Sequence, residues 1–169
     1  MDGSRRRLML GLGLAAGGAA GLVPLSLFAP ARAAGGTLLS LTDRAGRTSD
    51  FDLAALRALP QGTIAQITPW TETVNTYGGP RLRAVLAAGG VAAGETLTMT
   101  ALNDYAVEVP MADVRAYDLL LAMTCDGEAM PVRDKGPLWL HYPLAEYPAL
   151  ARNEIHARMI WQLRRIAVS

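Results

Sequence analysis

The chain has 169 residues, of which 51% are hydrophobic and 18% are charged, and its formal net charge at pH 7 is +1. Four of its 16 Lys and Arg residues but only one of its 15 Asp and Glu residues lie in residues 1–33, so residues 34–169 carry a formal charge of −2. Because nucleic-acid-binding proteins depend on clustered positive charge, we expect no nucleic-acid partner. The single cysteine, Cys125, excludes an internal disulfide bond.

Residues 1–33 are expected to be an export signal and not part of the fold. A basic stretch, "SRRRLML", precedes a glycine-rich apolar run and a small-residue cleavage site at Ala31-Arg32-Ala33. The stretch resembles a twin-arginine signal, and the alternative is an ordinary secretory signal with a basic start. Cleavage before Ala34 would leave one domain, residues 34–169, in the periplasm or otherwise exported. That domain is not expected to be integral to the membrane.

The first half of this domain predicts strands that alternate with two short helices. Apolar alternation indicates strands, and apolar residues spaced three or four apart indicate helices. Ser49 or Asp50 is expected to cap the first helix, and Pro60 to end it. In chain order we expect a strand at 37–43, a helix at 51–59, a strand at 63–68, an irregular loop at 70–80 and a helix at 81–90.

The second half predicts hairpins. Asn103-Asp104 and Asp126-Gly127 are favoured two-residue turns between apolar runs. In chain order we expect a hairpin at 95–110, a helical turn at 111–117, a hairpin at 118–132, and strands at 137–143 and 161–169. Together these elements predict an α+β domain with a mixed, largely antiparallel sheet and short helices.

No motif for metal binding or nucleophilic catalysis is present, so the catalytic residues are unknown and no metal ligands are predicted. His141 and His156 do not have the spacing of zinc ligands, and His141 is expected to be a half-exposed strand residue. None of the serines lies in a nucleophile elbow. Cys125 precedes a hairpin turn, which favours a residue at the end of a strand over a metal ligand.

Loop and turn residues are the remaining candidates for a binding site. The glycines after Tyr77 allow a ligand to approach the backbone closely, and Asn103 lies at a hairpin tip. Arg133 and Lys135 could bind an anion such as a phosphate. The alternative for that segment is a turn held by its own ion pairs with Asp134.

Residues 60–168 resemble the molybdopterin-binding domain of the sulfite oxidase family. The resemblance is carried by "YGGPRLRAVLAAGGV", by the hairpin "LTMTALNDYAVEVP" and by "LLLAMTCDGEAMPVRDKGPLWLHYP". It implies an α+β fold, a molybdopterin (molybdenum) cofactor and a periplasmic or membrane-bound redox or signalling partner. The cofactor-binding residues that it implies are Tyr77, Gly79, Arg81, Asn103, Asp104, Tyr105, Arg133, Lys135 and Gly136.

The chain departs from this family at the residues that would bind the metal and surround it. The family's cysteine thiolate would fall around residues 67–70, where the sequence "QITPWTET" has no cysteine. Trp139 stands where the family tends to have an arginine, and Lys135 where it has a histidine or asparagine. Two hypotheses remain open: a divergent, exported molybdopterin-binding-like oxidoreductase domain without the usual cysteine ligand, or a cofactor-free binding, sensor or accessory module that keeps the fold.

Overall fold

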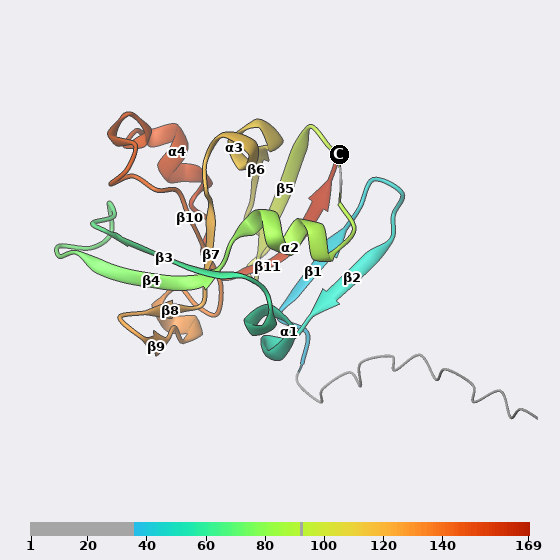
Figure 1. The fold of residues 1–169 in the computed structure, drawn as a ribbon, viewed down its shortest axis with the longest axis horizontal. Helices are drawn as coiled ribbons and strands as arrows, with labels where there is room; N and C mark the ends of the chain where they lie inside the picture. The colour runs from blue at the N-terminus through green and yellow to red at the C-terminus, as the bar shows by residue number, and fades with distance from the viewer. Residues whose placement is uncertain (1–35, 92) are drawn as a thin grey trace, which may run out of the picture. The chain divides into compact units, whose positions relative to one another are not determined.

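The computed structural model describes residues 36–91 and 93–169, and the residues assigned to an export signal lie outside this range. Within it, one sheet has five strands in the order β2-β1-β11-β5-β6 (Figure 1). Its strands are β1 (Leu39–Thr42), β2 (Thr48–Phe51), β5 (Thr96–Ala101), β6 (Ala106–Pro110) and β11 (Leu163–Val168). Only the β1–β11 pair is parallel, with Leu41 opposite Ile166.

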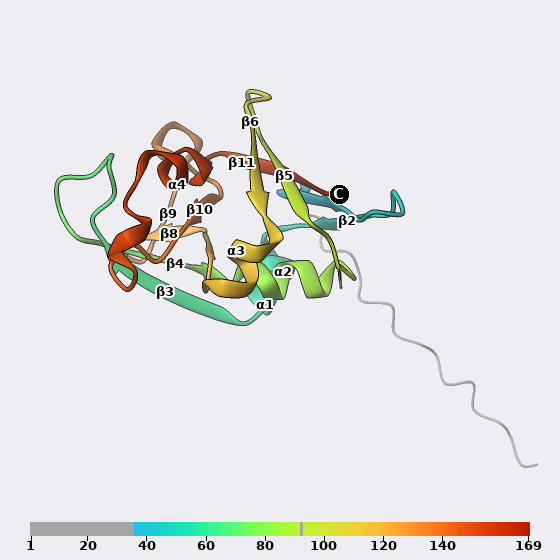
Figure 2. The same ribbon diagram turned by 90° about the horizontal axis from the view of Figure 1, so that it is seen from above.

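Alternating residues give this sheet one buried and one solvated face, as is common in antiparallel sheets. On the buried face, Leu39, Leu41, Leu97 and Met99 are fully buried. On the opposite face, residues such as Ser40 are polar and partly exposed. Three helices lie along one face (Figure 2). They are α1 (Leu53–Ala58), α2 (Leu82–Ala88) and α3 (Met111–Ala116).

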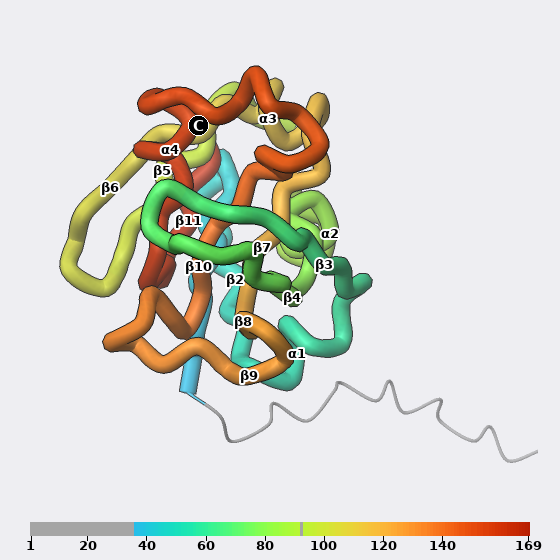
Figure 3. The backbone as a smooth tube through the Cα atoms, turned by 90° about the vertical axis from the view of Figure 1, so that its left-hand side faces the viewer, coloured from blue at the N-terminus to red at the C-terminus, as the bar shows by residue number. Residues whose placement is uncertain are grey.

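Two smaller sheets build the other part of the domain. One has the order β3-β4-β8-β9, and the other pairs β7 with β10. Their strands are β3 (Gln61–Gln66), β4 (Asn75–Pro80), β7 (Leu120–Ala122), β8 (Thr124–Cys125), β9 (Glu128–Ala129) and β10 (Trp139–His141). Figure 3 shows β3 and β4 crossing in front of β7 and β10, with the β8–β9 hairpin below and the segment of α4 (Asn153–Arg158) above.

The prediction of an irregular loop at 70–80 is wrong for its second half, because residues 75–80 form β4. The glycines that suggested a loop lie within this strand, where they allow close packing of the backbone. A Cβ atom at Gly79 would overlap the carbonyl oxygen of Leu121 in β7. Gly79 therefore lets two backbones pack against each other inside the fold.

The first helix also starts later than predicted. Its N-cap is Asp52, whose carboxylate accepts a hydrogen bond from the Ala55 N–H at 2.7 Å, and not Ser49 or Asp50. Residues 48–51 pair with β1 as β2, which buries Phe51 in the core. Two short 3-10 helices, Val132–Asp134 and Pro148–Leu150, complete the elements. No helix among the described residues has the length and apolar character needed to span a bilayer.

Candidate functional site

The chain has three tryptophans, and they meet in one place. Trp70 comes from the loop between β3 and β4, Trp139 from β10, and Trp161 from the segment before β11. The ring centroids of Trp70 and Trp161 are 5.1 Å apart and the rings are nearly perpendicular; Trp70 and Trp139 are 5.8 Å apart. Edge-to-face rings at such distances attract one another. The cluster is therefore a defined aromatic surface, partly buried and partly open to solvent.

A turn built by two threonines positions Trp70. The Thr68 N–H donates to the Thr71 hydroxyl at 2.9 Å, and the Thr71 N–H donates to the Thr68 carbonyl at 3.1 Å. The Trp70 N–H donates to the Thr68 hydroxyl at 3.3 Å. Thr68 itself is buried. This hydroxyl-stabilised turn explains why a loop without regular secondary structure can hold a large ring in place.

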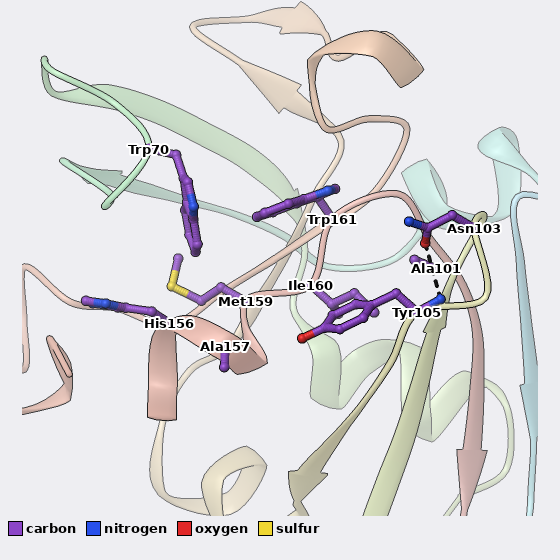
Figure 4. A pocket seen from close by; sticks show the side chains of 9 residues that line it. All are labelled: Trp70, Ala101, Asn103, Tyr105, His156, Ala157, Met159, Ile160 and Trp161. Atoms are coloured by element: carbon purple, nitrogen blue, oxygen red, sulfur yellow. Dashed lines mark hydrogen bonds between the residues drawn. The ribbon is translucent and has the colours of Figure 1, made fainter. Parts of the chain in front are cut away.

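Two of the tryptophans, Trp70 and Trp161, border a cavity of about 350 Å³, which we call the tryptophan pocket (Figure 4). This volume lies within the range of small-molecule sites. The lining residues are Trp70, Ala101, Asn103, Tyr105, His156, Ala157, Met159, Ile160 and Trp161. The pocket is therefore bordered by the Trp70 loop, the β5–β6 hairpin, the end of α4 and the segment that follows it.

A few polar groups interrupt this aromatic and apolar lining. The Asn103 side-chain oxygen accepts a hydrogen bond from the Tyr105 N–H at 3.2 Å, which leaves the amide NH₂ group of Asn103 available. The Nε2 atom of His156 is buried and has no hydrogen-bond partner in the part of the chain that the structure describes. Buried polar atoms usually have partners, so an unpaired one in a cavity wall marks a place where a ligand or a water can bind.

Behind the tryptophans lies His141, and the prediction that it is half-exposed is wrong, because it is fully buried. Its ring stacks on Tyr77 with centroids 4.0 Å apart and lies 4.2 Å from the Trp139 ring. Burial lowers the pKa of His141 to about 3, so the ring is neutral. The alternating pattern of β10 suggested exposure, but the loop that carries Trp70 and the β3–β4 pair cover this strand on its outer side.

Hydrogen bonds fix the tautomer of His141. The Gln66 side-chain oxygen accepts from the Leu144 N–H at 2.8 Å, so its NH₂ group faces the His141 Nδ1 at 3.1 Å. Nδ1 must therefore accept, and the proton sits on Nε2. That Nε2–H and the Tyr77 hydroxyl are both buried, and neither has a hydrogen-bond partner among residues 36–91 and 93–169. Burial raises the pKa of Tyr77, and the nearby Cys125 adds to the rise.

Lys135 supplies a positive charge beside the tryptophans. Its Nζ atom lies 5.5 Å from the Trp139 ring centroid and 5.9 Å from that of Trp161. No carboxylate lies within ion-pair distance of Lys135 among the described residues, unlike Arg133, which pairs with Asp134 at 3.3 Å. Lys135 also has a positive φ of 70°, a conformation that is uncommon for a residue with a side chain.

Lys135 also lines a second cavity of about 300 Å³, the lysine cavity, together with Tyr77, Trp139 and Cys125. The prediction that Cys125 ends a strand is confirmed. Its thiol donates to the Asp126 carboxylate at 3.8 Å, and burial together with that carboxylate raises the pKa of Cys125. Cys125 is therefore a neutral thiol that does not line the tryptophan pocket.

The structure divides the nine predicted binding residues between several places. Asn103 and Tyr105 line the tryptophan pocket, and Tyr77 and Lys135 line the lysine cavity. Asp104 lies on the hairpin tip, where its carboxylate pairs with an arginine of β11 at 2.9 Å.

The remaining predicted residues make contacts within the fold. Arg81 pairs with Asp118 at 3.1 Å, in contact with α2 and outside both cavities. Gly79 and Gly136 are both positions where a Cβ atom would overlap a backbone carbonyl. Arg133 is exposed.

Sequence reasoning missed the residues that form most of the tryptophan pocket. Trp70, His156, Met159 and Trp161 come from loops and from a short helix, and no spacing in the sequence connects them. The one available signal was composition. A chain with three tryptophans, two of them in segments without regular structure, has aromatic side chains that need a common place to pack.

Comparisons with known proteins show the family of the chain and a protein of similar fold. The family model of the oxidoreductase molybdopterin binding domain matches residues 39–146. Among solved structures, the chain is similar to the sulfane dehydrogenase SoxCD from Paracoccus pantotrophus, with a TM-score of 0.57 and 20% identity. That match covers 77% of this chain and 37% of the SoxCD chain. At this identity it shows the fold alone, and it confirms the predicted α+β class. No curated protein sequence matches.

The donor atoms of the site do not fit a thiolate-bound molybdenum. Residues 67–70 contain no cysteine, and Trp70 occupies this segment. Within residues 36–91 and 93–169, no group of three or more His, Cys, Asp or Glu side chains is placed to hold a metal ion. The organic part of a molybdopterin finds matching chemistry, because perpendicular aromatic rings suit a planar heterocycle and the Lys135 ammonium suits a phosphate.

Proposed function

The chain belongs to the oxidoreductase molybdopterin binding domain family, and from this premise we propose that it is an exported, divergent member that binds a pterin-type heterocycle in the tryptophan pocket. In this proposal no cysteine–metal bond contributes to binding. Recognition depends on ring stacking, on hydrogen bonds to the heterocycle edge and on one ammonium group for the phosphate.

The observation that carries this proposal is the convergence of Trp70, Trp161 and Tyr105 around a cavity of ligand size. The exposed fractions of Trp70 and Trp161 are 37% and 36%, high values for rings that are held by ordered contacts. A flat ring that stacks on one such side chain gains roughly 1–3 kcal/mol. Ligand binding would also give a partner to the buried Nε2 atom of His156.

The position of Lys135 supports an anionic group on the ligand. Its ammonium lies near the Trp161 ring, which borders the tryptophan pocket, and it forms no ion pair among the described residues, although Glu128 and Asp134 line the lysine cavity with it. A phosphate at this place would gain a charge-assisted hydrogen bond. The exposed Arg133 is less suited, because it already pairs with Asp134.

The proposal of export depends on the sequence of residues 1–33, with its arginine cluster, apolar run and small-residue cleavage site. The proposed location is the periplasm or another compartment outside the cytoplasm. A twin-arginine route would carry a protein already folded around its ligand.

The test is to purify the protein from the periplasm of its own host, and to measure pterin by fluorescence after oxidation and molybdenum by elemental analysis. We expect pterin without stoichiometric molybdenum. Trp161→Ala should lower the affinity for added pterin-6-carboxylate about tenfold, because one stacking face is lost. Tyr147→Ala is the matched control, since Tyr147 is a similarly exposed aromatic residue outside the pocket. Unchanged affinity in Trp161→Ala would refute the proposed pocket.

A cofactor-free binding, sensor or accessory module is the second candidate. The missing cysteine at residues 67–70 favours it, because a strong soft ligand to the metal is lost. Such a module would use the same face for a periplasmic or membrane-bound redox or signalling partner. Protein that contains no pterin and does not bind added pterin would support this candidate, whereas recovery of pterin would exclude it.

A further inference from the structure

A single segment, residues 156–161, forms one wall of the tryptophan pocket. His156, Ala157, Met159, Ile160 and Trp161 line the cavity from this segment. The Met159 carbonyl accepts from the Trp139 indole N–H at 2.9 Å, and the Ile160 carbonyl accepts from the Leu140 N–H at 2.9 Å. The position of this wall therefore sets the width of the pocket.

The helix that leads into the wall is weak on its own. α4 has six residues, and its N-cap, Arg152, makes no side-chain capping bond. Isolated helices of this length do not persist in water, so tertiary contacts must hold α4 in place. Its one fully buried residue is Ile155.

Besides the buried side chain of Ile155, a polar contact attaches α4 to the rest of the domain. Arg158, the last residue of α4, donates to the Asp113 carboxylate at 2.9 Å, and the Tyr142 hydroxyl donates to the same oxygen at 2.8 Å. The exposed fraction is 17% for the Asp113 side chain and 28% for that of Arg158, so solvent screens this pair only partly. Tyr142 is fully buried next to β10. Burial raises the pKa of Tyr142, and the Asp113 carboxylate adds to the rise, so the hydroxyl stays protonated and donates.

We propose that Asp113 is a positioning residue for ligand binding: it joins the rigid core at Tyr142 to the pocket wall through Arg158. Asp113 and Tyr142 line neither of the two cavities, so any effect on ligand affinity must act through the wall. Without the Arg158 contact, α4 loses its side-chain attachment to the core. The wall is then held by Ile155 and by the hydrogen bonds of Met159 and Ile160 to β10, so the distance of His156 and Trp161 from Trp70 is less tightly fixed.

The test compares Asp113→Asn, Arg158→Gln and the double variant with the wild type. We expect each single variant to bind pterin-6-carboxylate about tenfold more weakly, which corresponds to about 1.4 kcal/mol. The double variant should bind no more weakly than the singles, because both act through one contact. Asp43→Asn is the matched control, since it breaks an Asp–Arg pair at 2.7 Å in the β1–β2 turn, far from the wall in the fold.

A ligand-independent measurement separates this inference from the proposed function, on which the affinity measurement rests. With 5-fluorotryptophan incorporated, the ¹⁹F resonance of Trp161 should shift or broaden in Asp113→Asn and stay in place in Asp43→Asn. If the wild type binds no pterin, the proposed function fails while the resonance still tests the wall. If the melting temperature of Asp113→Asn falls but its affinity and the Trp161 resonance do not change, Asp113 is merely structural and the inference is overturned.

Discussion

The buried, neutral His141 should make the stability of the protein depend on pH in a way that one substitution removes. The pKa of His141 is lowered by burial to about 3 in the folded protein, against 6.5 for a free side chain. Between these values the unfolded state binds a proton that the folded state does not. The free energy of unfolding contributed by this residue is therefore complete above pH 6.5 and is lost as the pH falls toward 3.

The size of this pH effect on stability follows from the pH interval over which only the unfolded state is protonated at His141. Between pH 7.5 and pH 5.0 the His141 side chain of the unfolded chain goes from about one tenth protonated to almost fully protonated, while that of the folded chain stays neutral; each full proton contributes about 1.36 kcal/mol per pH unit. Integrated over this range, the wild type should lose about 2 kcal/mol of stability because of His141. This loss of about 2 kcal/mol is expected for any folded-state pKa of His141 well below 5. A pKa that low is consistent with a side chain that has no exposed area.

The assay is urea-induced unfolding at pH 7.5 and pH 5.0 for the wild type and for His141→Gln. Glutamine cannot titrate, and its side-chain oxygen can accept from Gln66 as Nδ1 does. The variant is expected to be less stable at both pH values because its packing changes. Its loss between the two pH values should be about 2 kcal/mol smaller than that of the wild type. Equal losses would show that His141 is not buried in its neutral form.

Three further predictions concern single residues. Asp52→Ala should lower the free energy of unfolding by about 1 kcal/mol, because the Ala55 N–H loses its cap; urea unfolding measures this, and no change would contradict the assigned cap. Gly79→Ala should prevent normal folding or lower the melting temperature severely, since its Cβ would overlap the Leu121 carbonyl; a normal melting temperature would contradict the close packing of β4 on β7. Cys125→Ser should leave pterin content and affinity unchanged, because the thiol lies outside the tryptophan pocket; loss of bound ligand or metal in this variant would refute that placement.

The sequence was a good guide wherever local chemistry determines structure. The Asn103-Asp104 turn, the helix after Pro80 and the strand that contains Trp139 all form where the pattern predicts them. Such elements depend on turn residues, helix spacing or apolar runs, which act over a few positions. The family resemblance added the fold class, which the family model and the structural match support.

Long-range contacts account for what the sequence did not indicate. The strand β4 has the composition of a loop and exists because β3 and β8 pair with it on both sides. His141 alternates as an edge residue would, yet distant segments bury it. The tryptophan pocket depends in the same way on segments that meet only in the folded chain. Trp70 and Trp161 are 91 positions apart in the sequence, and no local pattern connects them.

The place of β11 also constrains when the protein can fold during its synthesis. This strand, residues 163–168, lies between β1 and β5, and within the described residues it forms the only ladders that join the first strand pair to the second. Until these residues have left the ribosome, the β1–β2 and β5–β6 pairs remain separate ribbons, and each is marginal alone. The large sheet therefore cannot be completed until residues 163–168 have left the ribosome. Any route that exports the domain in its folded state has to wait for this strand.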